Sequence, residues 1–279
     1  MADPTFVTTY REEQIAAFEQ RYSKLRVTCV QHAQIKGNSA VFQVSGSGSA
    51  TAVTRGSNGL IPYSTTDNTQ NTCTLIEQHA PFERTGFNIF ATQGDMKAVM
   101  HKEAIGTLNR AIDQAIIDQL DTATLDTGTS ATASMTMVNK AMASLGNNNV
   151  PIEEEDNMFA VVTPAFLAYL RETTEFASGD YVDVKPLVGP VRPMWRWAGV
   201  NWLMHSGLTG IGTSTEKCYM YHQTAIGHAA NMKDMDVRVG YDEKQDLSWA
   251  RATLFSGAKL LQNAGVVQMK HDGSALVAS

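Results

Sequence analysis

The longest regular pattern of apolar and polar positions runs from Gly94 to Thr122. Apolar side chains recur in this segment every three to five residues: Met96, Met100, Ile105, Leu108, Ile112, Ile116 and Leu120. Charged and amide side chains fill most positions between them, and no proline interrupts the run. This spacing predicts one amphipathic helix. At 1.5 Å per residue the helix would be roughly 40 Å long, well above the three-turn average of globular proteins.

The segments before this helix carry two other patterns. Apolar positions in Glu12–Leu25 recur with helical spacing and predict a helix near the N-terminus. Serine, threonine, glycine and asparagine then dominate Ile35–Ala80, with extended runs at Ser39–Val44 and Thr72–His79. The two runs predict a two-stranded arm that reaches away from the core and needs a neighbour to lie on. A disordered or lid-like loop is the alternative interpretation of the same composition.

The segments after the long helix predict a mixture of helices and strands. Thr122–Thr136 is rich in small polar residues and predicts a hinge. Ser134 is a predicted N-cap, Met158–Val162 a buried strand, and Thr163-Pro164 the start of another helix.

The last part of the chain reads as strands. Runs at Lys217–Tyr221, Ser248–Phe255 and Val266–Met269 are strand-like, and Met235–Tyr241 alternates in a way that predicts a half-buried strand. The order of elements predicts an α+β fold, in which a sheet-and-helix platform carries an inserted second lobe.

Composition narrows the class of protein. The chain has 279 residues, of which 43% are hydrophobic, and a formal net charge of −6, which argues against a surface that grips nucleic acid throughout. The cysteines number three and lie far apart, which favours reduced thiols. The first ten residues do not read as a signal peptide, and no apolar run is long enough to cross a bilayer. We therefore expect a protein made in the cytosol that has no membrane partner.

The sequence carries no recognisable catalytic, cofactor-binding or metal-binding motif. The seven histidines show no metal-ligand spacing, and Gly207–Gly212 lacks the lysine of a phosphate-binding loop. The acidic run Glu153–Asp156 reads as a solvated loop. Trp195 and Trp197 indicate either packed corners of a small β region or a surface buried by another subunit. We therefore expect no catalytic residue, cofactor or metal.

Three local stretches and the order of the elements resemble one known family. The stretches are Gly37–Phe42, Tyr221–His228 and Met235–Asp242. With the arm, the long helix and the returning strands, the chain resembles the major capsid protein of tailed bacteriophages, which has the Hong Kong phage-type capsid fold. The nearer likeness is to short-tailed phages whose subunits carry no fused scaffold.

The resemblance implies a division of the chain. It assigns residues 1–35 to an N-terminal arm and 36–80 to an extended loop that lies across the next subunit. Residues 81–122 and 226–279 would form a peripheral domain around the long spine helix. Residues 123–225 would form an inserted axial domain. At the tip of this loop, Phe42, Arg55 and Tyr63 are the candidate intersubunit contacts.

The resemblance also implies partners. The chain would assemble with its own copies as pentamers and hexamers into an icosahedral shell in the host cytoplasm and then reside in the virion. A separate scaffolding protein, a portal protein, decoration proteins and packaged double-stranded DNA, bound without sequence specificity, are the further partners expected. Some family members cross-link through a loop lysine. Because Lys36 lies only at the base of the loop and Arg55 is near its tip, we predict no covalent cross-linking.

Two alternatives stay open at this stage. One is a cytosolic α/β enzyme whose glycine-rich segment is a flexible lid over a deep pocket. The other is a phage tail or adhesion component, which would form rings or fibres and would be richer in strands.

Overall fold

The computed structural model describes residues 19–32, 35, 37–48, 50–86, 96–177, 194–231 and 236–276. Its helices are α2 (Met96–Leu120), α3 (Met135–Asn147), α4 (Pro164–Glu172) and α5 (Thr174–Ala177). Its strands are β1 (Val30–His32), β2 (Ser39–Gly46), β3 (Asp67–Thr74), β4 (Ile76–Thr85), β5 (Met158–Val162), β6 (Met194–Trp197), β7 (Val200–Met204), β8 (Glu216–His222), β9 (Ile226–Ala230), β10 (Asp236–Asp242), β11 (Leu247–Leu260) and β12 (Val266–His271). Short 3₁₀ turns are η1 (Arg26–Thr28), η2 (Glu155–Asn157), η3 (Gln223–Ala225), η5 (Asn263–Gly265) and η6 (Ser274–Leu276).

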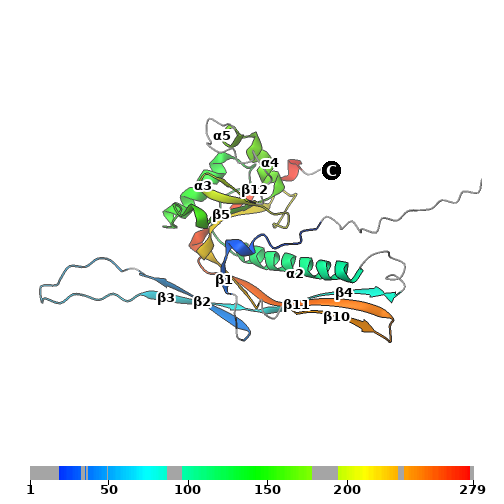
Figure 1. Ribbon diagram of the computed structural model, residues 1–279. Helices are drawn as coiled ribbons and strands as arrows, with labels where there is room; N and C mark the ends of the chain where they lie inside the picture. The colour runs from blue at the N-terminus through cyan, green and yellow to red at the C-terminus, as the bar shows by residue number, and fades with distance from the viewer. Residues whose placement is uncertain are drawn as a thin grey trace, which may run out of the picture.

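The first sheet is built around β11, a strand of 14 residues. Its main strand order is β1-β9-β11-β10. Strand β4 also pairs with β11, on the edge opposite β10. Helix α2 lies across β4 and β11 on one face of this sheet (Figure 1). Leu108, Ile112 and Ile116 of the helix pack with Ala252 and Leu254 of β11 in a shared core. The 25-residue helix thus buries its apolar stripe on the sheet, as the spacing predicts.

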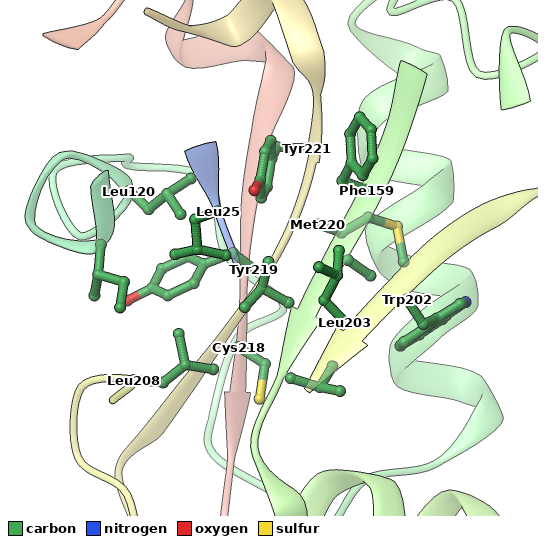
Figure 2. Packing of buried hydrophobic residues seen from close by; sticks show 14 of the residues in the cluster. Leu25, Leu120, Phe159, Trp202, Leu203, Leu208, Cys218, Tyr219, Met220 and Tyr221 are labelled. Atoms are coloured by element: carbon green, nitrogen blue, oxygen red, sulfur yellow. The ribbon is translucent and has the colours of Figure 1, made fainter. Parts of the chain in front are cut away.

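The second sheet has the order β12-β8-β5-β7-β6 and lies with α3, α4 and α5 on the other side of α2 (Figure 1). Its core contains Trp202 and Tyr219, which are fully buried. Leu25 and Leu120 approach Tyr219 from outside the sheet (Figure 2). The cores of the two sheets therefore form one continuous apolar cluster.

The third sheet is the hairpin of β2 and β3, in register from Ser39↔Thr74 to Gly46↔Asp67. It projects from the rest of the molecule, and its connecting loop continues outward beyond the paired strands (Figure 1). The α+β class and the two-stranded arm are confirmed.

Several local predictions are also confirmed. The strands β5, β8, β11 and β12 contain the segments that the sequence indicates, although β11 is longer than expected. Helix α4 begins after Thr163, whose Oγ1 accepts a hydrogen bond from the Phe166 N–H at 3.2 Å. Helix α3 begins after Ser134, but the Ser134 side chain makes no cap hydrogen bond.

The predicted helix Glu12–Leu25 is wrong where the structure describes it. Residues 12–18 lie outside the described part, and residues 19–25 are not helical. The backbone N–H groups of Lys24 and Leu25 donate to the Asp113 carboxylate on α2 instead of to carbonyls within their own segment. A tertiary acceptor has therefore replaced the local helical hydrogen bonds.

The predicted single strand Thr72–His79 is divided in two. The break falls at Leu75, whose N–H donates to the Asn38 carbonyl at 2.8 Å. Before the break β3 pairs with β2 of the arm, and after it β4 pairs with β11 of the first sheet. One extended run therefore contributes to two sheets.

The strand predicted at Met235–Tyr241 exists as β10, but its predicted half-burial holds only at Val237, which packs partly buried against the main core. Val239 and Tyr241 are 50% and 55% exposed, and Met235 lies outside the described residues. Strand β10 is at an edge of the sheet, while α2 covers β4 and β11. Beyond Val237, the alternating face of β10 is consequently exposed.

The predicted hinge Thr122–Thr136 is irregular, as expected, but is bound along β12. The Thr127 N–H donates to the Gln268 carbonyl at 3.0 Å, and the Gln268 N–H donates to the Leu125 carbonyl at 2.8 Å. The Gln268 side chain adds a bond to the Ala123 carbonyl at 2.8 Å. A bend here would break these bonds, so the structure does not support a free hinge.

Candidate assembly interface

The root of the arm is fixed to the first sheet by an apolar contact. Phe42 of β2 is only 4% exposed and packs with Cys73 and Ala229. Side chains alternate along a strand, and Leu254 and Ala252 face α2, so the register places Gly227, Ala229 and Gly257 on the face away from that helix. The arm therefore roots on the sheet face that α2 leaves open.

Two glycines allow this close approach. A Cβ on Gly227 would lie 2.7 Å from the Phe42 ring, and a Cβ on Gly257 would lie 2.6 Å from the Thr74 carbonyl oxygen. Glycine inside a strand typically marks such a close contact between backbones or side chains. The arm thus has a defined direction as it leaves the sheet.

The tip of the arm, residues 50–66, has no such support. The Gly56 N–H donates to the Leu60 carbonyl at 2.8 Å, which closes a turn. Large apolar side chains are nevertheless exposed along the tip: Val53, Leu60, Ile61 and Tyr63. Exposed apolar side chains that gather on one projecting segment indicate a surface that a partner covers.

Arg55 and Tyr63 both lie on this tip. The Tyr63 side chain is 97% exposed. One Arg55 nitrogen, Nη1, donates to the Gly59 carbonyl at 3.0 Å, and no carboxylate among the described residues pairs with the guanidinium. Because a guanidinium carries five N–H donors, Arg55 keeps most of its hydrogen-bonding capacity for another molecule.

The other sequence-predicted residues fall elsewhere. Phe42 is at the buried root, where it packs within its own chain, so the structure separates it from Arg55 and Tyr63. Lys36 lies outside the described residues. Sequence reasoning did not single out Gly227 and Gly257, although a glycine inside a strand pattern is a signal for close approach.

The cysteine thiols are buried, and the described residues hold no cluster of metal-ligating side chains. Burial raises the pKa of both the Cys29 and the Cys218 thiol to about 12, so neither is a thiolate at neutral pH. All three cysteines are buried and free of disulfides. No group of three or more histidine, cysteine or acidic side chains in the described ranges could hold a metal ion.

The acidic loop Glu153–Asp156 forms ion pairs, and Trp195 and Trp197 pack in the core. Arg196 forms an ion pair with Glu155 at 3.3 Å and another with Asp156. Trp195 and Trp197 are buried in the main core, which favours the first of the two interpretations, packed corners. Within the part of the chain that is described, no helix has the length and hydropathy needed for a membrane span.

The projecting hairpin, the long helix across one sheet and the second α/β unit define the capsid fold of tailed phages. Solved structures with this fold align over nearly the whole chain. A structure from Mycobacterium phage Che8 has a TM-score of 0.71 at 16% identity and covers 96% of this chain and 98% of its own. The capsid of cyanophage P-SCSP1u has a TM-score of 0.69 at 14% identity, with 96% and 93% covered. The capsid of Ralstonia phage GP4 has a TM-score of 0.69 at 11% identity, with 96% and 95% covered.

The family follows from the sequence itself. The model of the family described as "Phage capsid protein" matches residues 2–273, and the chain belongs to this family. No curated protein sequence matches the chain. The protein is therefore a structural capsid protein of a bacteriophage, and its place is the shell of the virion, where it associates with copies of itself.

Proposed function

We propose that this protein is the major capsid protein of its phage and assembles as pentamers and hexamers into an icosahedral shell around double-stranded DNA. The observation that carries the proposal is the arm, which combines a root packed on the first sheet with an exposed apolar tip. At about 3.3 Å per residue, the chain from Gly46 to Gly56 can reach roughly 30 Å beyond the paired strands. A two-stranded hairpin is marginally stable by itself, so a neighbouring subunit under the tip would stabilise the part of the arm that the first sheet does not support.

Arg55 and Tyr63 are the proposed intersubunit contacts of the tip. Tyr63 offers a large amphipathic ring, and Arg55 offers unpaired donors that suit a carboxylate on a neighbour. Phe42 supports the same contact from within the chain, because it holds the root in place. Many copies of one modest contact add up to a strong shell through multivalency.

The four-part division into 1–35, 36–80, 81–122 with 226–279, and 123–225 is also proposed, with two adjustments. Strand β4 pairs with β11, which favours ending the loop near Thr74. Strand β12 pairs with β8, which favours grouping residues 266–276 with the axial unit. The peripheral unit is then the first sheet with α2.

Further partners and the site of assembly complete the proposal. A separate scaffolding protein, a portal protein and decoration proteins are proposed from the family resemblance, with assembly in the host cytoplasm. The net charge of −6 suits a lining that holds DNA without binding it tightly. No lysine stands between Lys36 and Lys97, which supports a shell held without covalent cross-links through the loop.

Negative-stain electron microscopy tests the assembly. The full chain would be expressed alone and with a candidate scaffolding protein, and each preparation imaged. Closed icosahedral shells, or rings of five and six subunits, are expected in at least one preparation. Uniform small particles in both, together with a thermal shift on a small-molecule panel, would instead favour an enzyme, and stacked rings or fibres would favour a tail component.

A denaturing gel of the purified shells tests the absence of cross-links. A single band near the subunit mass of 30.4 kDa is expected. A ladder of multimers after boiling with detergent and reductant would contradict the proposal.

A further inference from the structure

A buried carboxylate on α2 holds a segment that is far away in sequence. We call residues 19–25 the strap, because they run along α2. Asp113 is only 1% exposed and accepts hydrogen bonds from Ser23 Oγ at 2.6 Å, Lys24 N at 3.0 Å and Leu25 N at 3.1 Å. The Gln20 side-chain amide donates to the same carboxylate. One carboxylate therefore accepts four hydrogen bonds from the strap.

The same carboxylate also holds a loop of the second sheet. His205 follows β7, and its Nε2 lies 3.2 Å from Asp113 Oδ2. Its Nδ1 accepts a hydrogen bond from the Gly207 N–H at 2.9 Å, so the ring proton is on Nε2 and is donated to Asp113. A Cβ on Gly207 would lie 2.9 Å from His205 Cε1, which shows how closely the loop folds over the ring.

The other contacts of the strap are mostly polar. Asn109 Nδ2 donates to the Arg21 carbonyl at 2.8 Å, and Arg110 Nη1 donates to the Gln20 carbonyl at 3.1 Å. Tyr22 points into solvent. Leu25 anchors one end of the strap in the main core, so the position of residues 19–24 depends mainly on these hydrogen bonds and on those to Asp113.

The charge on Asp113 makes these bonds interdependent. Burial by itself would raise the pKa of this carboxyl, but the hydrogen bonds from His205, Ser23 and the strap backbone outweigh burial and leave the pKa below its usual value. A buried charge that loses one donor has no water to replace it, and the remaining donors must adjust. Strap and loop thus share one electrostatic centre, and Lys24 Nζ of the strap also donates directly to the Met204 carbonyl beside His205 at 3.1 Å.

We propose that Asp113 couples the strap to the loop at 205–207, so that the strap lies on α2 when the loop is closed and releasing either one loosens the other. The coupling is a property of the single chain. Its consequence in a shell rests on the proposed function: a neighbouring subunit that displaces the strap would also shift the loop at 205–207. By thermodynamic reciprocity, the effect must be measurable in both directions.

Hydrogen exchange at single-amide resolution on the unassembled full chain tests the coupling. Ser23→Ala removes one donor from the strap side, and His205→Leu removes the donor from the loop side. We expect Ser23→Ala to speed exchange of the Gly207 amide about three- to ten-fold, although Ser23 makes no hydrogen bond to the loop. We expect His205→Leu to speed exchange of the Lys24 and Leu25 amides by about ten-fold or more.

Asn263→Ala is the control, because it removes the hydrogen bonds of Asn263 to Thr124 and touches neither the strap nor the loop. It should leave exchange at Lys24, Leu25 and Gly207 unchanged. The proposal fails if Ser23→Ala leaves Gly207 exchange unchanged, or if the control speeds it equally, which would indicate global loosening. These results do not depend on shell formation, so they are distinguishable from a failure of the proposed function.

Discussion

At the scale of single residues, His228 is buried without a matching charge. It lies on β9, is 1% exposed, and its Nε2 has no hydrogen-bond partner among the described residues. Burial first, and the nearby Arg26 guanidinium second, lower the pKa of His228 to about 4, while Asp113 opposes them. The imidazole is therefore neutral in the folded protein at pH 7.

This burial predicts a loss of stability in mild acid. The unfolded chain has an ordinary histidine pKa near 6.5, so between about pH 6.5 and 4 the unfolded state binds more protons than the folded state. The free energy of unfolding should consequently fall as the pH drops through this window, by up to about 3 kcal/mol from His228. Urea unfolding at pH 7, 6, 5 and 4.5 measures this slope.

The variant His228→Gln cannot titrate and should show a shallower slope over the same range. Equal slopes for His228→Gln and the wild type would show that His228 does not cause the acid sensitivity.

At the scale of elements, the arm depends on a residue that has no side chain. Phe42 lies directly against Gly227, so an added methyl group would overlap the ring. Gly227→Ala is expected to lower the free energy of unfolding by about 1–3 kcal/mol, as overpacking of a close contact does. It should also speed hydrogen exchange of the β2 amides, because the root must shift away from the sheet.

Gly46→Ala is the control for this prediction. Its added methyl group would lie 3.7 Å from the Asp67 carbonyl oxygen, an ordinary contact, so stability should change by less than about 0.5 kcal/mol. If both variants were equally stable, the root would not be held by the fit of Phe42 on Gly227.

At the scale of the whole molecule, stability of the subunit and stability of the shell should separate at the arm tip. Arg55→Ala and Tyr63→Ala remove exposed side chains, so the unfolding free energy of the unassembled chain should change by less than about 0.5 kcal/mol. Assembled particles of either variant should dissociate at a lower denaturant concentration, measured by light scattering. Ser57→Ala at the same tip is the control, and particles of Arg55→Ala as stable as the wild type would exclude Arg55 from the interface.

The sequence by itself determined the elements whose signals are local. Helix α2 follows from apolar spacing, α4 from a threonine cap before proline, and β5 from a short apolar run. The exposed arm follows from a composition that cannot build a core. The order of these elements was enough to identify the class of fold, because each signal depends only on residues close together in the chain.

The tertiary structure decided everything that depends on which element covers another. Asp113 looks like one more polar residue of an amphipathic helix, and only the fold brings Ser23 and His205 to its carboxylate. Residues 19–25 have helical spacing, yet this acceptor holds the backbone N–H groups of Lys24 and Leu25. Val239 alternates as a buried residue would, yet α2 crosses β11 and leaves β10 uncovered. Periodicity reports which side chains share a face, whereas burial and hydrogen-bond partners are set by sheet register and packing between distant segments.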